Sequence, residues 1–314
     1  MMPSTQNRKI SITDLPSVQG RYVEKAPMSA ITWFRVGGDA DVLYTPNDEE
    51  DLCGFLKSVD PAIPISTVGV GSNLLVRDGG IRGVVIRLGA SFAKIEVDEK
   101  IVLAGAAALD ASVAKAAARN GLTGLEFFRG IPGTIGGALR MNAGAYKSET
   151  RDVMIDCNAI DRNGDRHTFT CEDMGFSYRH CGIPGDYIFT SARFCTEIGD
   201  PALIEQRMLE IMSAREASQP IKSRTGGSTF ANPDPLLSDG RKSWQLIDEI
   251  GGRGRTIGDA QVSDHHCNFM INRGEATASD IETLVKGLQK DVLDKTGIEL
   301  RLEIKVIGES VKVG

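Results

Sequence analysis

Residues 124–146, GLEFFRGIPGTIGGALRMNAGAY, set the strongest limit on how this chain can fold. Glycine is too frequent in this stretch for a continuous helix to be stable on propensity alone. The four glycines between residues 130 and 137 let the backbone approach a flat or phosphorylated group, and Thr134 adds a hydroxyl donor. The alternative is a packing loop in which closely crossing strands select glycine. The stretch is therefore a candidate cofactor-binding loop.

A second glycine cluster, Gly69-Val70-Gly71, follows the β-rich run that begins at Ile65. The dinucleotide-binding fingerprint needs a third glycine three positions later, at the start of a helix, but Leu74 stands there and no helical pattern follows. That interpretation is excluded. The tight turn Gly71-Ser72-Asn73 remains, and its backbone N–H groups suit an anion. Two such clusters favour one shared, phosphate-bearing cofactor.

The composition is that of an ordinary globular protein. The 314 residues suffice for about two domains, and 41% hydrophobic and 25% charged residues argue against disorder. A net charge of −6 lacks the basic excess expected of a nucleic-acid or anionic-membrane binder. Glycine, at 35 residues, exceeds its usual share of about 7%, which agrees with tight turns or close approach to a ligand.

The ends of the chain and the cysteines indicate a cytoplasmic protein. There is no run of roughly 18 uncharged apolar residues, so no membrane helix is expected. Residues 1–25 are polar, lack the apolar centre of a signal peptide and are expected to be a frayed extension. The six cysteines form no CxxC pair and are expected to be reduced. His265 and His266 are adjacent and point to different sides, so no metal site is predicted.

The residue pattern around the glycine clusters predicts an α+β protein. We expect a strand pair over 30–46 that turns at Gly37-Gly38, and strands over 81–105 and up to Phe194. The closing stretch 298–308 is predicted to be a strand with Leu300, Leu302, Ile304 and Val306 on one face. Capping and stop signals predict helices at 47–59 (capped by Asn47), 110–120 (capped by Asp110), 201–218, 243–250 and 277–296. The polar loop at 219–240 places a domain boundary near residue 215.

Three further residues are weak candidates on their own. Ser228 lies in a glycine-set turn that lacks the GxSxG spacing of a nucleophile elbow, so it is either a turn residue or a hydroxyl held toward a ligand. Arg179 follows Tyr178 and either forms a surface pair with it or binds a carboxylate or phosphate. Glu303 lies on the polar face of the closing strand, which favours a solvated position.

The chain resembles the UDP-N-acetylenolpyruvoylglucosamine reductase family, flavoenzymes of bacterial cell-wall precursor synthesis. The resemblance runs from about Ala30 to Gly308 and rests on seven blocks in the family's order: TWFRVGGDADVLYTP, VGVGSNLLVRDGGIRGVVIRL, GLEFFRGIPGTIGGALRMNAGAY, GFSYRHC, GGSTFANP, HHCNFMIN and LRLEIKVIG. It implies an FAD-binding half of the vanillyl-alcohol-oxidase (PCMH) type over 26–214, in two subdomains split near residue 90. A smaller α+β substrate domain then spans 215–308, and its last strand returns to the active site.

The resemblance also implies the reaction and its residues. NADPH reduces non-covalent FAD, and the flavin then reduces the enolpyruvyl ether of UDP-N-acetylglucosamine to UDP-N-acetylmuramate. The matched catalytic positions are Arg179, Ser228 and Glu303, and the matched substrate positions are Tyr178, Asn232 and His266. The matched FAD contacts are Gly69, Gly71, Ser72, Asn73, Gly130, Ile131, Pro132, Gly133, Thr134, Gly136 and Asn142.

The chemistry of this reaction suits the three catalytic residue types. Hydride addition builds negative charge toward the substrate carboxylate, and the permanently charged Arg179 can stabilise that charge as it develops. Ser228 can deliver a proton to the adjacent carbon. Glu303 either orients Arg179 and the carboxylate or holds a proton if burial raises its pKa. The sequence leaves both roles of Glu303 open.

The chain departs from the wider family in a few places. Only about thirty residues separate Phe194 from Arg224, so the tyrosine-bearing lid of some members is absent and the chain resembles the shorter subgroup. Ala231 stands where lysine or arginine is common, and Arg301-Leu302 replaces Glu-Pro. Two other functions remain possible interpretations of the sequence: an FAD-dependent oxidase of the same fold, and a non-catalytic nucleotide-binding regulator. We expect a monomer that binds neither nucleic acid nor membrane.

Overall fold

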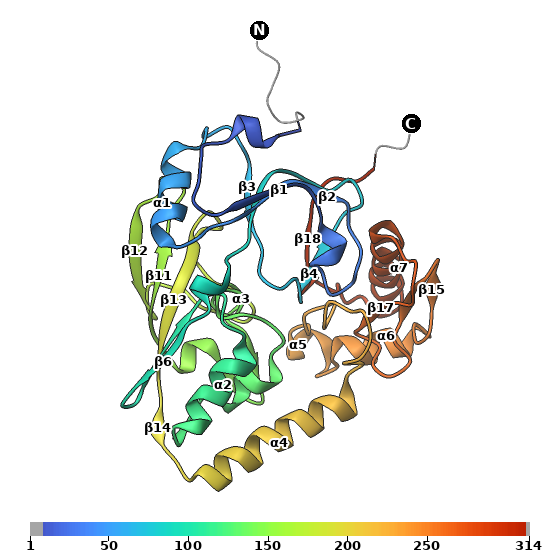
Figure 1. The fold of residues 1–314 in the computed structure, drawn as a ribbon. Helices are drawn as coiled ribbons and strands as arrows, with labels where there is room; N and C mark the ends of the chain where they lie inside the picture. The colour runs from blue at the N-terminus through green and yellow to red at the C-terminus, as the bar shows by residue number, and fades with distance from the viewer. Residues whose placement is uncertain (1–8, 312–314) are drawn as a thin grey trace. The chain divides into compact units, whose positions relative to one another are not determined.

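The computed structural model describes residues 9–311, and the chain falls into two compact units (Figure 1). Unit 1 takes its described residues from 9–25, Asp41–Gly69 and Gly83–Ala214, and unit 2 takes them from Ala26–Ala40, Val70–Arg82 and 215–311. Each unit therefore combines segments that are far apart in the sequence. The expected flavin half included 26–40 and 70–82, which this division assigns to unit 2.

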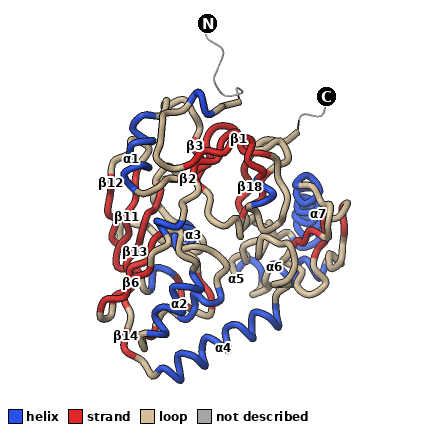
Figure 2. Tube along the Cα trace, in the orientation of Figure 1, coloured by secondary structure: helices blue, strands red, loops and turns tan. Residues whose placement is uncertain are grey.

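Unit 1 is built on an antiparallel five-stranded sheet, whose strands are red in Figure 2. The register places Ala192 opposite both Cys157 and Ala104. The short helices beside this sheet contribute Val113, Phe128 and Ile135 to its core. In sheet order the strands are β12 (Arg166–Thr170), β11 (Met154–Ile160), β13 (Ile188–Cys195), β7 (Ile101–Gly105) and β6 (Ile95–Asp98), and the helices are α2 (Asp110–Arg119), η5 (Glu126–Gly130) and α3 (Ile135–Met141).

A second sheet and helix α1 (Glu49–Ser58) complete most of unit 1. In α1, the Phe55 ring packs against Tyr44 in a tilted arrangement, with ring centroids 4.5 Å apart. Asp51 accepts hydrogen bonds from the backbone N–H groups of Gln19 and Gly20 and from the Tyr44 hydroxyl. Burial alone would raise the pKa of Asp51, but these donors lower it below its usual value. The strands of this sheet are β1 (Arg21–Pro27), β2 (Asp39–Thr45), β5 (Ile81–Ile86) and β3 (Ile65–Thr67), several of which cross the division between units.

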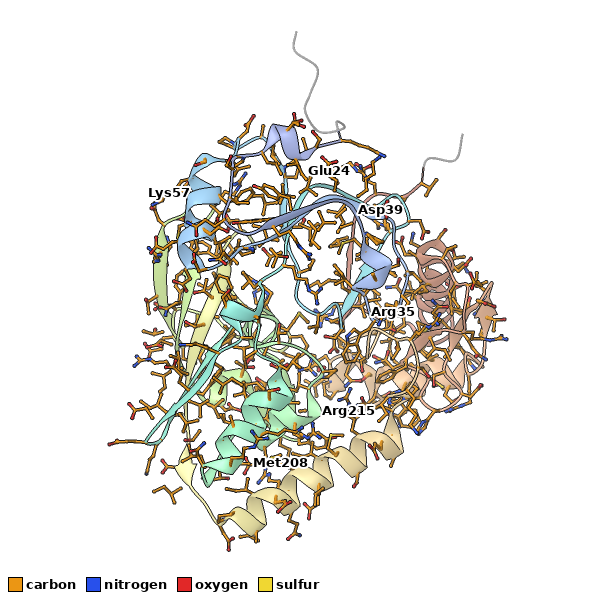
Figure 3. The ribbon with its side chains drawn as sticks, viewed as in Figure 1. Glu24, Arg35, Asp39, Lys57, Met208 and Arg215 are labelled. Carbon is orange, nitrogen blue, oxygen red and sulfur yellow. The ribbon has the colours of Figure 1, made fainter. Side chains whose placement is uncertain are left out.

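Helix α4 (Pro201–Ser218) follows the sheet and crosses the division between units. Its Ile204 and Ile211 are buried, and Met208, labelled in Figure 3, packs against the five-stranded core. The hydroxyl of Tyr146 donates to the Ile211 carbonyl at 3.0 Å. The remaining short elements of unit 1 are η2 (Ile12–Asp14), η4 (Ala90–Phe92), β8 (Leu122–Thr123), β9 (Gly144–Ala145), β10 (Ser148–Glu149), η6 (Thr150–Asp152) and β14 (Glu197–Ile198).

Unit 2 has its own core, formed by helix α7 (Ala278–Thr296) and a three-stranded sheet. Arg77 forms two hydrogen bonds of 3.0 Å to Glu282 in α7, and Asp78 accepts from the N–H groups of Ala278 and Ser279. The segment 70–82 is thereby bound to α7. The other elements are η3 (Met28–Ala30), β4 (Leu74–Val76) paired with β18 (Lys305–Ile307), α5 (Pro235–Ser238), α6 (Ser243–Glu249), β15 (Thr256–Ile257), β16 (Ala260–Val262) and β17 (Met270–Asn272).

The long helices agree with the sequence prediction. Helix α4 has the predicted bounds, and α6 ends one residue early. Helix α7 begins after the predicted cap Thr277 and ends at Gly297, which adopts a left-handed φ of 71°. These helix ends depend on local capping residues, which can be recognised in the sequence.

Several local predictions were wrong. No strand pair turns at Gly37-Gly38, because only 39–45 is a strand there and it lies between β1 and β5 in the sheet. A β-carbon at Gly38 would collide with the Asp78 carbonyl, so close crossing of the segment 70–82 selects that glycine. Asp48, not Asn47, caps α1, and Asp110 is the first residue of α2 without a capping bond. Leu302 is 41% exposed because residues 301–304 leave strand geometry.

The N-terminal prediction also needs correction for the residues that the structure describes. Residues 1–8 lie outside the described part, whereas 9–25 are folded and not frayed. Ile10, Leu15 and Val18 pack against the core around α1, and Arg21 begins β1. Between residues 9 and 311, no helix combines the length and the apolar character needed to cross a membrane.

Candidate active site

Arg179 lies at the tip of a tight turn in unit 1. Ser177 and His180 exchange two backbone hydrogen bonds of 3.1 Å, which leaves Tyr178 and Arg179 as the turn residues. Arg179 has a φ of 56°, in the left-handed region that costs a non-glycine residue roughly 1–2 kcal/mol. Its guanidinium carbon lies 5.2 Å from the Tyr178 ring centroid. A strained backbone at an arginine is a feature of functional sites.

Asn142 supports this turn from inside unit 1. It is fully buried, ends α3 in a left-handed conformation and has every polar group of its amide bonded. Its nitrogen donates to Glu149 Oε2 and to the Ser177 carbonyl, and its oxygen accepts from the Arg151 N–H. Asn142 was predicted to contact FAD directly. These bonds hold the turn that carries Arg179, and the contact between Asn142 and FAD stays a prediction.

The two glycine clusters approach each other within unit 1. A β-carbon on Gly69 would lie 3.0 Å from the Thr134 hydroxyl oxygen. At Gly136 it would meet Ala106 at 3.2 Å, and at Gly130 it would collide with the Tyr146 ring. The Gly133 carbonyl accepts from the N–H of Asp110. Glycine is required at these positions because other parts of the chain approach closely.

Asp110 is an unusual residue beneath this loop. It is fully buried, and neither carboxyl oxygen has a hydrogen-bond partner within residues 9–311. Burial in these surroundings raises the pKa of Asp110 well above its usual value. Burial therefore favours the uncharged form of this carboxyl group.

The turn Gly71-Ser72-Asn73 belongs to unit 2. Gly71 has a φ of 69°, and its carbonyl accepts from the Trp33 N–H. The Asn73 amide nitrogen donates to the Glu303 carbonyl at 3.1 Å, and the Asn73 carbonyl accepts from the Lys305 N–H. Asn73 therefore fastens the turn to the closing segment.

Ser228 and Glu303 come together in unit 2. Ser228 forms a bridge with Phe269, and the adjacent Thr229 carbonyl accepts from the Glu303 N–H at 2.9 Å. Gly227 has a φ of 81°, and a β-carbon there would meet only the Ser72 carbonyl, at 4.0 Å. Three predicted segments, around Ser72, Ser228 and Glu303, thus form one cluster. Arg179 lies in unit 1.

Asn232 and His266 form a second group in unit 2. The Asn232 side-chain oxygen accepts from the Ser243 N–H, and Ser243 begins α6. His266 is half-buried between Trp244 and Phe269, with ring centroids 6.1 and 4.9 Å away. Sequence reasoning missed Trp244, since a tryptophan near the start of a predicted helix is read as a core residue. Its proximity to Asn232 comes only from the fold.

The residues of unit 1 suit a phosphate-bearing cofactor. Gly69 lies beside the Thr134 hydroxyl, Gly133 precedes Thr134 in the chain, and at Gly137 a β-carbon would meet only that hydroxyl, at 3.9 Å. This arrangement combines close backbone approach with a donor, which is the donor set that a phosphate needs. We expect Gly69, Gly133 and Thr134 to hold such a group.

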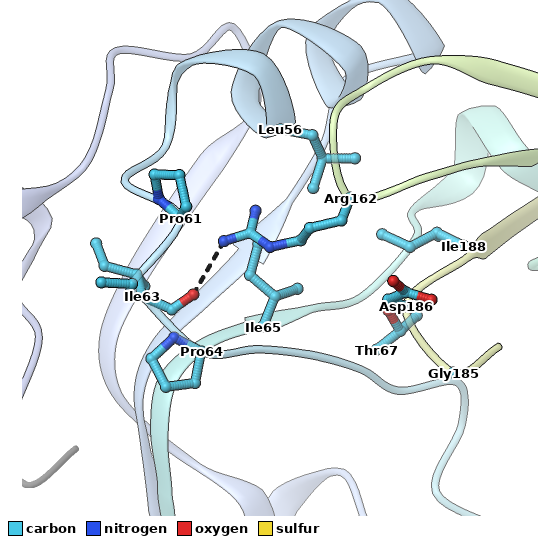
Figure 4. A pocket seen from close by; sticks show the side chains of 11 residues that line it. Leu56, Pro61, Ile63, Pro64, Ile65, Thr67, Arg162, Gly185, Asp186 and Ile188 are labelled. Atoms are coloured by element: carbon cyan, nitrogen blue, oxygen red, sulfur yellow. Dashed lines mark hydrogen bonds between the residues drawn. The ribbon is translucent and has the colours of Figure 1, made fainter. Parts of the chain in front are cut away.

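Metal centres and disulfides were sought among the residues that the structure describes. The described residues contain no group of three or more side chains suited to a metal ion. All six cysteines are free thiols, and four of them are buried. A cavity of about 280 Å³ opens elsewhere in unit 1 (Figure 4). Arg162 at this cavity donates to the Ile63 carbonyl, and none of the predicted site residues lines it.

Comparisons with known proteins agree with this arrangement. Residues 40–170 match the model of an FAD binding domain, and residues 219–307 match the C-terminal domain of UDP-N-acetylenolpyruvoylglucosamine reductase. The reductase of Parvibaculum lavamentivorans is 54% identical over 297 residues, which cover 95% of this chain and 94% of the relative. The chain belongs to the UDP-N-acetylenolpyruvoylglucosamine reductase family. The predicted family, the α+β class and the FAD-binding domain are confirmed.

Further relatives support the same assignment. The reductase of Rhodospirillum rubrum is 52% identical, with 95% of this chain and 93% of the relative covered. The crystal structure of the reductase of Thermus caldophilus has 34% sequence identity and a TM-score of 0.78, over 92% of this chain and 99% of the other. The family assignment therefore extends over almost the whole chain.

Proposed function

We propose that this protein reduces the enolpyruvyl ether of UDP-N-acetylglucosamine to UDP-N-acetylmuramate, with NADPH as the reductant. The observation that carries the proposal is family membership over both the FAD-binding and the C-terminal domain. The free thiols fit a protein of the cytoplasm, where peptidoglycan precursors are made. We propose that it acts as a monomer, because this one chain supplies each proposed catalytic residue.

FAD, held by the glycine loops, would supply the chemistry of hydride acceptance and donation. Arg179 is proposed to bind the substrate carboxylate. Its guanidinium is planar and permanently charged, so it can form two parallel hydrogen bonds to a carboxylate and stabilise charge that develops there. The left-handed turn fixes the direction in which the side chain leaves the backbone.

Ser228 is the proposed proton donor to the carbon beside the reacting one. Its hydroxyl has no hydrogen-bond partner within residues 9–311 and is half-exposed, so it is free to face a ligand. Glu303 is joined to the next residue, Thr229, through the backbone. We propose that Glu303 orients the carboxylate-binding groups or holds the proton that Ser228 passes on.

The proposed cofactor contacts and the proposed substrate contacts lie in both units. Gly130, Ile131, Pro132 and Gly136 would complete the FAD loop of unit 1, and Ser72 and Asn73 would contribute from the second turn. Tyr178, Asn232 and His266 are the proposed substrate contacts. An FAD-dependent oxidase of the same fold is the second candidate, but no observation on this chain favours it.

The test is product formation. Purified protein is incubated with FAD, NADPH and the enolpyruvyl sugar nucleotide, and products are followed by mass spectrometry. The proposal predicts a product heavier by two hydrogens and one NADPH oxidised for each product formed. Oxidation of NADPH that needs oxygen and leaves the sugar unchanged would contradict it and favour the oxidase.

A further inference from the structure

A short segment of unit 2, residues 31–36, has no part in the proposed chemistry but touches two of the turns that do. We call it the linking segment. The Phe34 ring is completely buried and belongs to the core of unit 2. The side chains of the segment alternate: Thr32, Phe34 and Val36 are buried, and Trp33 and Arg35 are exposed.

The linking segment lies against the cofactor turn, Gly71-Ser72-Asn73. The Trp33 N–H donates to the Gly71 carbonyl at 3.1 Å. A β-carbon on Gly71 would come within 2.8 Å of the Ile31 carbonyl oxygen and of the Thr32 Cα atom. The two backbones are therefore in direct contact, and the linking segment fixes the place of a turn that is proposed to reach FAD.

The linking segment also lies against the serine turn, residues 224–228. A β-carbon on Gly226 would lie only 2.3 Å from the Phe34 ring, so the ring packs directly on that glycine. The Phe34 carbonyl accepts from the Asn272 side-chain nitrogen at 2.9 Å. The Asn272 N–H in turn donates to the Arg224 carbonyl at 2.9 Å. Phe34 is thus joined to the serine turn through its ring directly and through its carbonyl by way of Asn272.

The two turns that the linking segment contacts lie next to each other. A β-carbon on Gly227 would meet the Ser72 carbonyl at 4.0 Å. Within residues 9–311, no hydrogen bond joins the cofactor turn to the serine turn directly. The spacing between the two turns therefore depends on the segment that packs against both.

Local hydrogen bonds hold the linking segment in a strained shape. The Thr32 hydroxyl donates to the Val36 carbonyl at 2.8 Å, and the Arg35 guanidinium donates to the Ala30 carbonyl at 2.7 Å. Arg35, labelled in Figure 3, has a φ of 58°, which costs a non-glycine residue roughly 1–2 kcal/mol. Strain of this kind is concentrated at functional sites, and a segment that only filled the core would not need it.

We propose that Phe34 is a positioning residue for the reduction step: its ring holds Ser228 at the distance from the cofactor turn that proton transfer requires. Phe34 acts through Gly226 and carries no proton itself. Because a misplacement of about 1 Å can slow a reaction roughly 10²-fold, a smaller side chain at this position should slow proton transfer although the serine hydroxyl is still present. This inference rests on the proposed function, which makes Ser228 the proton donor.

Phe34→Leu tests the inference, because it keeps an apolar side chain but removes the ring that packs on Gly226. We expect flavin reoxidation by the enolpyruvyl sugar to slow at least about tenfold. The ratio of the reoxidation rates in H₂O and D₂O should rise, because proton transfer then limits the step. FAD affinity and flavin reduction by NADPH should stay near wild type, since the bond from Trp33 to Gly71 involves only backbone atoms. Stopped-flow absorbance measures both half-reactions, and fluorescence titration measures FAD affinity.

A compensating pair of substitutions gives a sharper test. The φ of Gly226 is not in the left-handed region, and the three atoms nearest to a β-carbon there all belong to the Phe34 ring. Gly226→Ala alone should therefore slow reoxidation, whereas in Phe34→Leu the added methyl group can occupy space that the ring leaves. We expect the double variant to reoxidise about threefold faster, or more, than either single variant.

Phe55→Leu is the matched control for a general loss of stability. Phe55 is also almost completely buried, but it lies in α1 of unit 1 and in a different core. The control should lower the melting temperature, as Phe34→Leu does, and leave the reoxidation rate and its H₂O/D₂O ratio unchanged.

The outcomes separate this inference from the proposed function. A folded Phe34→Leu variant with the wild-type reoxidation rate and H₂O/D₂O ratio would overturn the proposal, as would equal slowing in Phe55→Leu. If Phe34→Leu does not fold, Phe34→Met and Gly226→Ala are measured in the same way and decide the question, since methionine adapts to irregular space. Absence of UDP-N-acetylmuramate in the wild-type turnover assay would instead overturn the proposed function.

Discussion

The segment that carries Arg179 and the segment that carries Ser228 are held in place by different kinds of contact. Arg179 lies in a short local turn with a strained φ of 56°, and the buried side chain of Asn142 supports that turn. Ser228 lies in an extended segment whose neighbours pair with Asn268 and Glu303, far away in the sequence. Local strain fixes the direction of one side chain, whereas long-range backbone pairing fixes the place of the other. We therefore expect substitutions that alter the turn to impair Arg179. At Ser228, only substitutions that remove the hydroxyl group should have a large effect.

The largest expected effect comes from Ser228→Ala. If Ser228 donates the proton, flavin reduction by NADPH should stay near normal, while flavin reoxidation by the enolpyruvyl sugar should slow by roughly 10²–10⁴-fold. Stopped-flow absorbance of each half-reaction without oxygen measures this. If the serine only shapes the turn, both halves should be nearly unaffected. Equal slowing of both halves would point to a displaced flavin and contradict both accounts.

Arg179→Lys tests the chemistry at the strained turn. An ammonium cannot reproduce the planar, two-pronged contact of a guanidinium. We expect reoxidation by the sugar to slow at least about tenfold, which corresponds to about 1.4 kcal/mol of transition-state stabilisation. Arg179→Gly is the matched control, since it should relieve the backbone strain and raise the melting temperature while it abolishes the same step. Unchanged reoxidation in Arg179→Lys would remove Arg179 from the site.

Asn142→Ala tests the support beneath the turn. The change leaves the part-buried Arg151 N–H without its acceptor and removes the donor to Ser177, so unfolding should require about 1–3 kcal/mol less free energy. Urea unfolding measures the loss. Reoxidation by the sugar should fall more than flavin reduction by NADPH, because Arg179 loses its position. A fully stable variant that merely lost FAD would support a direct cofactor contact instead.

Gly227→Ala gives the matching test beside Ser228. A β-carbon has open space there, so the only cost is the left-handed φ of 81°, about 1 kcal/mol. We expect a small loss of unfolding free energy and little change in either half-reaction, because long-range pairing still holds Ser228. A loss of activity as large as that of Ser228→Ala would show that local strain matters here too.

Asp110→Asn tests, through the pH dependence of stability, the raised pKa of the buried Asp110 carboxyl group. The pKa of Asp110 is raised on folding, so the folded state keeps a proton that the unfolded state releases above about pH 4. Wild-type stability should therefore decline as pH rises from 4, and the Asn variant should lack that part of the decline. Relative to wild type, the variant should therefore gain stability as pH increases above about 4. Parallel pH profiles would mean that Asp110 is ionised in the folded protein.

The sequence predicted best those features that depend on neighbouring residues. Thr277, Asp280 and Gly297 mark the ends of α7 by local hydrogen bonding, and the structure confirms them. The Gly37-Gly38 turn was wrong because the close approach of Asp78, about forty residues later, selects glycine at 38. The closing strand was too long because pairing with β4 covers only Lys305–Ile307.

In the candidate site too, the sequence identified individual residues but not the contacts between residues that are distant in the chain. Motif matching named Arg179, Ser228 and Glu303, and the structure adds that Ser228 and Glu303 are neighbours through Thr229. Motif matching could not show that the Asn142 side chain forms hydrogen bonds within the protein, because its partners Glu149 and Ser177 come together only in the fold. The proximity of Trp244 to His266, 22 positions later in the chain, likewise comes only from the fold.

The most direct measurement follows the visible absorbance of the wild-type flavin in one sealed, oxygen-free sample. The account predicts that purified protein is yellow, that NADPH bleaches it, and that the enolpyruvyl sugar nucleotide then restores the colour as UDP-N-acetylmuramate forms. A reduced flavin that stays bleached with this substrate, and regains colour only when oxygen is admitted, would contradict the central claim.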